Sequence, residues 1–82
     1  MRRVVLYGSP ACHLCAAAKA KLERVRRLVA FDFREIDIRG DPQLLARYAT
    51  RIPVVEVDGR DALVSKVTEF RLLRALLSGQ RP

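Results

Sequence analysis

The sequence lacks any apolar run long enough to cross a bilayer. A transmembrane helix needs about 20 consecutive apolar residues, and no stretch of this chain approaches that length. The chain also has only one histidine, His13, and only two cysteines, Cys12 and Cys15. This disfavours a cysteine-protease mechanism, because neighbours in a helix point apart and no second histidine can serve as general base. Internal repeats, linkers and low-complexity segments are absent as well.

The amino-terminal arginines, Arg2 and Arg3, are followed by neither an apolar segment of usable length nor a small-residue cleavage site. We therefore expect no signal peptide and a cytoplasmic location. With 82 residues, half of them hydrophobic and 30% charged, the chain is typical of one folded globular domain spanning residues 1–82.

Lysine and arginine outnumber aspartate and glutamate by 16 to 9, which gives a net charge of +7. Residues 1–30 carry seven basic side chains and one acidic side chain, and residues 66–82 carry four basic side chains and one acidic side chain. Residues 31–65 carry five basic and seven acidic side chains. The excess thus falls on segments expected to be mainly helical, where basic residues usually form a solvated face. Without a nucleic-acid-binding motif, this charge does not favour nucleic acid as a partner.

Apolar periodicity predicts the first half of the fold. An apolar, β-favouring run indicates a buried strand over residues 4–7. A helix is expected over about residues 12–28, because one of its faces would carry Leu14, Ala18, Leu22, Val25 and Val29. A second strand is expected over residues 31–38, although its alternation changes phase between Phe33 and Ile36.

The second half begins at Asp41-Pro42, which favours a helix start because Asp caps a helix and Pro suits its first position. The apolar side of this short helix would carry Leu44, Leu45 and Tyr48. A hairpin is expected from strands over residues 54–57 and 60–64, joined by an Asp58-Gly59 turn.

A last helix is expected from about residue 67, with Phe70, Leu73 and Leu77 on its apolar face. It would end at Gly79, ahead of a frayed tail over residues 80–82. The order β-α-β-α-β-β-α predicts an α/β fold in which a four-stranded mixed sheet is covered by helices on both faces.

Both cysteines lie in one motif, Cys12-His13-Leu14-Cys15, where the first strand gives way to the first helix. Their spacing puts both sulfurs on one side of the first helical turn, close enough to form a disulfide. The helix N-terminus favours an anion, which lowers the pKa of the Cys12 thiol. Cys12 is therefore the predicted nucleophile, and Cys15, one turn inside the helix, is the predicted resolving thiol.

Other interpretations of the cysteine pair stay open. A structural disulfide across so short a loop would add little stability, and a reducing cytosol disfavours it. Zinc needs four ligands, so a zinc or iron–sulfur site built on this motif would require a dimer. The alternative to redox catalysis is thus a redox-inactive adaptor or a metal-binding dimer. His13 either adds positive charge beside Cys12 or is an exposed side chain without catalytic duty.

These residues resemble the thioredoxin superfamily and, within it, the small glutaredoxin-like proteins. The resemblance covers about residues 3–78 and rests on the strand at residues 4–7, the cysteine motif, and Ile52-Pro53 ahead of the hairpin. It implies a thioredoxin-like fold of the glutaredoxin type, and it implies the same roles for Cys12 and Cys15. The motif is similar to that of short bacterial glutaredoxin-like proteins whose substrates are unassigned.

The resemblance also implies that the Ile52–Pro53 bond is cis and lies against the Cys12 sulfur. The main chain of Ile52 would then pair with a substrate chain in the manner of an added strand. His13 and Pro10, on either side of Cys12, complete the expected substrate-binding residues.

Three departures from glutaredoxins bear on the substrate. His13 stands where glutaredoxins carry a proline between the cysteines, Ser9 stands where they carry a lysine, and residues 63–66 replace their Gly-Gly turn. These departures argue against a dedicated glutathione site, although Arg51 and Lys66 offer positive charge to a carboxylate.

We therefore expect a monomeric thiol–disulfide oxidoreductase. Its partners would be protein or small-molecule disulfides, with a reductase or glutathione as electron donor. No tightly bound organic cofactor, metal ion or membrane is expected.

Overall fold

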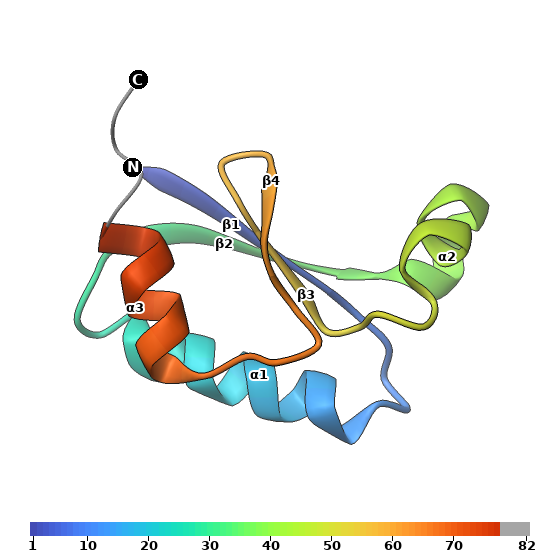
Figure 1. Cartoon of the computed structure of the whole chain (residues 1–82), viewed down its shortest axis with the longest axis horizontal. Helices are drawn as coiled ribbons and strands as arrows, with labels where there is room; N and C mark the ends of the chain where they lie inside the picture. Colours follow the sequence, from blue (N-terminus) through green and yellow to red (C-terminus); the bar gives the residue numbers. More distant parts are fainter. Residues whose placement is uncertain (78–82) are drawn as a thin grey trace.

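The computed structural model describes residues 1–77, which form a four-stranded mixed sheet flanked by helices (Figure 1). The elements in chain order are β1 (Arg2–Gly8), α1 (His13–Val25), β2 (Phe31–Asp37), a 3₁₀ turn (Ile38–Gly40), α2 (Pro42–Tyr48), β3 (Val54–Val57), β4 (Arg60–Val64) and α3 (Glu69–Leu77). The strand order is β2-β1-β3-β4, with β1 and β2 parallel and the other pairs antiparallel. The α/β fold class and the element order are confirmed.

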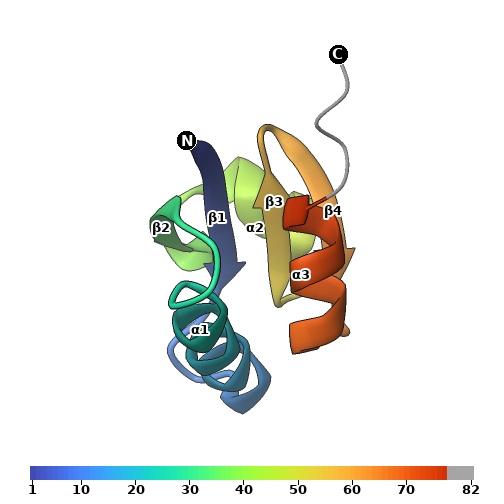
Figure 2. The ribbon, with the colours of Figure 1, turned by 90° about the vertical axis from the view of Figure 1, so that its left-hand side faces the viewer.

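The helices cover both faces of the sheet, as predicted (Figure 2). One face packs against α1 and α3, and its largest apolar contributors include Leu6, Leu22, Phe31, Leu72 and Leu76. The other face packs against α2, where Tyr48 meets Tyr7 and Val54. Successive residues of β1 point to opposite faces, so this strand serves both cores.

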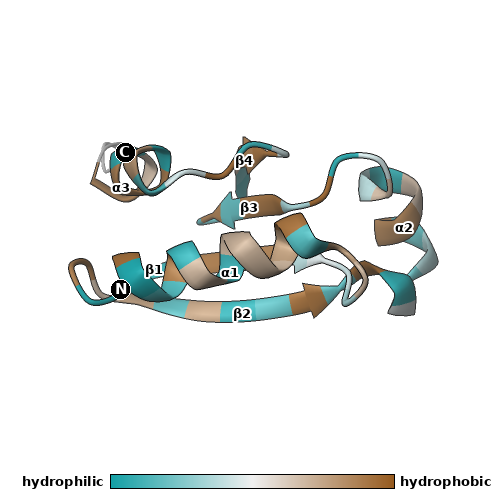
Figure 3. Cartoon of the chain, turned by 90° about the horizontal axis from the view of Figure 1, so that it is seen from below, coloured by the Kyte–Doolittle hydropathy of each residue, from teal (hydrophilic) through white to brown (hydrophobic). Residues whose placement is uncertain are grey.

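The phase change in β2 is a change of face and not a break in pairing. β2 runs beside β1 without a register shift, from Arg2 opposite Phe31 to Gly8 opposite Asp37. Phe33 packs with the core of the α1 face, whereas Ile36 packs with the core of the α2 face. As an edge strand, β2 is mainly hydrophilic, whereas β3 is mainly hydrophobic (Figure 3).

Helix α1 is shorter than predicted and is rotated slightly from its expected face. It ends at Val25, because Arg27 and Leu28 donate tighter turn bonds to the carbonyls three residues before them. The predicted core position of Leu14 is wrong, since this side chain is 52% exposed and Cys15 is buried instead. Val29 packs on the core from the loop, which is why the apolar period extends beyond the helix.

Helix α3 begins at Glu69, two residues later than predicted, because the Thr68 hydroxyl caps it by accepting the N–H of Arg71. Its predicted apolar face is only partly confirmed: Leu73 packs against the core, but Phe70 and Leu77 are exposed. The fully buried positions are Leu72 and Leu76. The predicted end at Gly79 and the tail over residues 80–82 lie outside the described residues.

The remaining elements follow their local signals closely. Asp41 caps α2 by accepting the N–H groups of Gln43 and Leu44, with Pro42 in the first position. Tyr48 is buried, but Leu45 is exposed, contrary to its predicted core role. β2 ends one residue early, because Ile38 enters the 3₁₀ turn.

The predicted hairpin turn is confirmed. Asp58 and Gly59 have φ angles of 50° and 86°, which fits a two-residue turn with both centres in the left-handed region. No helix within residues 1–77 is long and apolar enough to cross a membrane.

Candidate active site

The cysteine motif and the Ile52–Pro53 segment lie at the same end of the sheet. Tyr7, near the end of β1, pairs with Val54 at the start of β3. The loop that follows β1 therefore meets the loop that precedes β3 (Figure 1). The sheet thus brings the two segments to the same end of the molecule. The contact of Pro53 with the Cys12 sulfur that the resemblance implied stays a prediction.

Cys12 is the N-cap of α1, and its sulfur faces the first helical turn. Its Sγ accepts the N–H of Cys15 at 3.3 Å, and its own N–H donates to the Ser9 carbonyl at 3.1 Å. The pKa of the Cys12 thiol is lowered, chiefly by the hydrogen bond from the Cys15 side chain and further by the N–H groups of Cys15 and Leu14. Partial burial opposes this shift without reversing it. The thiolate form of Cys12 is therefore favoured, as the sequence predicted.

Cys15 has the opposite character. It is only 5% exposed, and burial raises the pKa of its thiol to about 11. Donating its side-chain hydrogen bond to Cys12 adds to this shift, as do the negative charges of Cys12 and Glu35. Both cysteines are free thiols in this structure. The pair thus combines a half-buried thiol with a lowered pKa and a buried thiol that keeps its proton.

Gly8 leaves the space that Cys15 occupies. A Cβ on Gly8 would lie 2.9 Å from the Cys15 Sγ and 3.0 Å from its Cβ, closer than side chains pack. The sequence indicated Gly8 only as the end of a strand. Its contact with Cys15 becomes visible only when the helix is folded back over β1.

The Ile52–Pro53 peptide bond is cis, as the resemblance implied. Pro53 is fully buried, and Ile52 is half-buried. The carbonyls on either side of Ile52 are both bound by Ser65, through its N–H to Pro53 and its hydroxyl to Arg51. Within residues 1–77, the main-chain N–H and carbonyl of Ile52 have no hydrogen-bond partner.

The other predicted substrate-binding residues are exposed. His13 is not among the groups that shift the pKa of Cys12. Pro10 lines a depression of about 310 Å³ together with Glu35 and Asp37. Arg51 and Lys66 are exposed and flank the segment held by Ser65. Within residues 1–77, no group of three or more His, Cys, Asp or Glu side chains is placed to share a metal ion.

The fold and this site together define a protein of thioredoxin-like fold with a Cys-x-x-Cys pair at the start of its first helix. A model of the Glutaredoxin-like domain (DUF836) matches residues 3–77, so the chain belongs to this glutaredoxin-like family.

Its relatives are consistent with that assignment. An uncharacterized protein of Mycobacterium tuberculosis, Rv0508, is 32% identical over 75 residues, covering 85% of this chain and 77% of that protein. The X-ray structure of a Xanthomonas protein (XcR50 from X. campestris) has a TM-score of 0.80 at 31% identity, covering 93% of this chain and 97% of the other. The oxidized mitochondrial thioredoxin 3 of Saccharomyces cerevisiae shares the fold alone, with a TM-score of 0.71 at 14% identity over 95% and 78% of the two chains.

Proposed function

We propose that this protein is a thiol–disulfide oxidoreductase that reduces disulfides with the Cys12–Cys15 dithiol. The observation that carries the proposal is the contrast between the two thiols. Cys12 is at a helix N-terminus with a lowered pKa, and Cys15 is one turn inside with a pKa raised to about 11. A thiolate is the nucleophile in disulfide exchange, so this contrast selects Cys12 for the first attack.

The reaction transfers two electrons in two exchange steps. The Cys12 thiolate attacks one sulfur of the substrate disulfide, which forms a mixed disulfide and releases the other sulfur as a thiolate that takes up a proton. The Cys15 thiol then loses its proton and attacks the Cys12 sulfur. The Cys12–Cys15 disulfide forms, and the second substrate thiol leaves. An external dithiol or two monothiols restore the reduced pair and are themselves oxidised.

The mixed disulfide also favours the second step. Two of the causes that raise the pKa of Cys15 are its hydrogen bond to the Cys12 sulfur and the charge of Cys12. Both weaken once Cys12 is a neutral disulfide, so the pKa of Cys15 falls when its thiolate is required. Burial, the largest cause, persists and keeps Cys15 protonated in the resting protein.

The free main chain of Ile52 supports a binding mode for the substrate. An extended peptide could pair with this N–H and carbonyl as an added strand and bring its disulfide to Cys12. The proposal therefore includes peptide disulfides as substrates. The electron donor is an external thiol reductant.

The first experiment is to equilibrate the purified protein with glutathione redox buffers and to quantify the Cys12–Cys15 disulfide by thiol alkylation. We expect a disulfide that forms and breaks reversibly. Two thiols that never form a stable disulfide would contradict the proposal. Metal analysis of the anaerobically purified protein tests the competing function. A metal ion bound by a dimer would favour a metal-binding protein over an oxidoreductase.

Turnover of a peptide disulfide assigns the two roles. Cys12→Ser should abolish turnover, whereas Cys15→Ser should accumulate a mixed disulfide on Cys12 that can be seen by mass spectrometry. Normal turnover by Cys15→Ser without added glutathione would show that the dithiol mechanism is wrong.

A further inference from the structure

Ser65 has a backbone conformation that its residue type rarely adopts. Its φ is +68°, in the left-handed region that favours glycine. Asp58 also has a positive φ, but the hairpin turn accounts for it. Ser65 follows β4 outside any hairpin, at the centre of a tight turn in which the Lys66 N–H donates to the Val64 carbonyl at 2.7 Å. A turn of this kind with a positive φ at its centre is rare and strained. Such outliers persist where the surrounding structure holds them, often beside a functional site.

The left-handed conformation directs two donors of Ser65 at one neighbouring segment. The Ser65 N–H donates to the Pro53 carbonyl at 2.8 Å, and the Ser65 hydroxyl donates to the Arg51 carbonyl at 3.1 Å. One residue therefore binds the carbonyls immediately before and after Ile52. A second anchor, the N–H of Arg51, donates to the Tyr48 carbonyl at 2.8 Å.

Ile52 lies between these anchored residues, Arg51 and Pro53, and its own main chain is unpaired. Ile52 has neither its N–H nor its carbonyl bonded within residues 1–77, and it lies at the end of the sheet where Cys12 is located. The bond to the Arg51 carbonyl fixes the peptide plane that carries the Ile52 N–H, and the bond to the Pro53 carbonyl holds the peptide plane that follows Pro53. Ser65 thereby fixes the direction of the Ile52 N–H and holds the chain beyond the Ile52 carbonyl, the two groups that an added peptide strand would use.

We propose that Ser65 is a positioning residue that orients the Ile52 main chain for an extended peptide disulfide. This role rests on the proposed oxidoreductase function and assigns a residue to its peptide substrates, because a small disulfide without a peptide main chain cannot use Ile52 in this way. Ser65 does not touch the reacting sulfurs; it acts through Ile52.

The test compares two disulfides on three proteins. The substrates are a short extended peptide with a mixed disulfide and hydroxyethyl disulfide, which has no peptide bond. The proteins are the wild type, Ser65→Gly and Ser65→Asn. Glycine accepts the positive φ and keeps the N–H to Pro53 but lacks the hydroxyl. Asparagine tolerates the same region, and its amide offers a donor for the Arg51 carbonyl.

We expect Ser65→Gly to raise KM for the peptide disulfide roughly two- to tenfold, the range that one hydrogen bond supplies, with little change in kcat. Its kinetics with hydroxyethyl disulfide should match the wild type. Ser65→Asn should restore most of the lost affinity for the peptide.

The outcomes separate this role from the proposed function. If the wild type reduces both disulfides and Ser65→Gly leaves the KM ratio between them unchanged, the positioning role is wrong and the oxidoreductase function stands. An equal loss on both substrates, together with a lower melting temperature, would show a merely structural role and would also overturn it. If the wild type reduces neither disulfide, the oxidoreductase function itself is wrong, and the role of Ser65 with it.

Discussion

The two cysteines differ because one helical turn changes their surroundings. Cys12 is at the end of the helix, where the N–H groups of Leu14 and Cys15 are available to a thiolate. Cys15 is inside the core, 5% exposed, and its burial penalises the charged form. The hydrogen bond between the two side chains increases the contrast, since the donor keeps its proton and the acceptor keeps its charge.

Removing the Cys15 thiol should make Cys12 less acidic. In Cys15→Ala the Cys12 thiolate loses the hydrogen bond that contributes most to lowering its pKa. We expect the pH midpoint for alkylation of Cys12 by iodoacetamide to rise, and each unit of increase lowers the thiolate fraction well below the midpoint about tenfold. The matched control is His13→Gln, which should leave the midpoint in place. A midpoint that moves in the His13 variant and not in Cys15→Ala would contradict this assignment.

Gly8→Ala should disturb the resolving cysteine directly. The new Cβ would lie 2.9 Å from the Cys15 Sγ, so either the strand or the start of α1 must move. We expect a loss of about 1–3 kcal/mol in the free energy of unfolding, measured in urea, and a slower release of the mixed disulfide. Gly40→Ala is the control, because a Cβ there meets nothing within 4 Å. Equal stability of the two variants would show that the close approach is not a constraint.

At the scale of residues, the reacting cysteines can be predicted from the sequence, whereas the residues that surround and position them cannot. Cys12 and Cys15 are recognisable because their relation is local: three positions apart at the start of a helix. Gly8 and Ser65 are not, because their partners, Cys15 and the Arg51–Pro53 segment, become neighbours only in the folded chain. No short-range signal marks Ser65 as a residue with positive φ.

At the scale of elements, Tyr48 connects α2 to the sheet and to the segment that enters the site. Its ring packs on Tyr7 with centroids 4.8 Å apart, and its hydroxyl donates to the Asp61 carboxylate on β4 at 3.0 Å. The Tyr48 carbonyl in turn accepts the N–H of Arg51, just before Ile52. The side chain is 1% exposed, so the position of α2 depends on this contact.

Tyr48→Phe should loosen α2 and remove a pH dependence. Burial, followed by the hydrogen bond to Asp61, raises the pKa of Tyr48 to about 12 from an ordinary value of 10.0. The folded state favours the protonated Tyr48 hydroxyl. The stability that this hydroxyl contributes to the fold is therefore complete below pH 10 and is lost between about pH 10 and 12. Urea unfolding below pH 10 should show that Tyr48→Phe is less stable than the wild type by roughly 1–2 kcal/mol. Above pH 10 the stability of the variant should decline less than that of the wild type.

The comparison for this prediction is Tyr7→Phe. The Tyr7 hydroxyl donates to Glu56 at 3.3 Å, a longer and single bond, so its removal should cost less. Titration by ultraviolet absorbance should show a tyrosine that titrates at about pH 12 and is absent from Tyr48→Phe. The pKa of Tyr7, which burial and Glu56 also raise, stays elevated in that variant. If the variant retained both the stability and the alkaline decline of the wild type, the Tyr48–Asp61 contact would have no energetic role.

Predictability at this scale follows the strength of local signals. The helix-start signal Asp41-Pro42 and the turn signal Asp58-Gly59 each depend on contacts within a few residues. The helix α2 and the hairpin turn both form where these signals predict them. The face of α3 depends on how the helix meets the sheet, which periodicity alone does not determine. The Lys21 ammonium binds the Val67 carbonyl ahead of α3, and Leu72 and Leu76, not Phe70 and Leu77, face the core.

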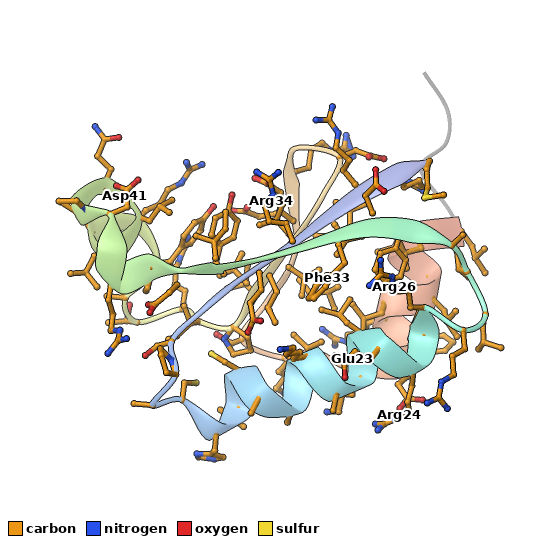
Figure 4. The ribbon with its side chains drawn as sticks, turned by 180° about the vertical axis from the view of Figure 1, so that it is seen from behind. Glu23, Arg24, Arg26, Phe33, Arg34 and Asp41 are labelled. Atoms are coloured by element: carbon orange, nitrogen blue, oxygen red, sulfur yellow. The ribbon has the colours of Figure 1, made fainter. Side chains whose placement is uncertain are left out.

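At the scale of the whole molecule, part of the positive charge holds the elements together. Lys21 binds the loop before α3, and Arg24 pairs with Glu69. Arg26 lies over the ring of Phe33, with its guanidinium carbon 5.9 Å from the ring centroid (Figure 4). The same carbon is 5.8 Å from the centroid of the Phe31 ring. The predicted solvated face of the first helix is thus also a set of contacts to β2 and α3.

The net charge of the chain, +7, should favour acidic disulfide substrates. Arg51 and Lys66 are exposed beside the segment that contains Ile52, so an acidic peptide would meet positive charge where it is proposed to bind. We expect kcat/KM for an acidic peptide disulfide to fall roughly tenfold between low and physiological salt, because screening weakens electrostatic steering. A neutral peptide of the same length should change little.

Two double variants locate the charges responsible. The first variant combines Arg51→Gln with Lys66→Gln. The second combines Arg27→Gln, on the loop after α1, with Arg71→Gln, on α3. Each variant removes two exposed positive charges. The first pair should lose more of the preference for the acidic peptide, because Coulomb energy falls with distance and salt screens the remote pair. Equal losses in both variants would mean that only the total charge matters. An acidic peptide with the same salt response as the neutral one would show that charge does not select the substrate at all.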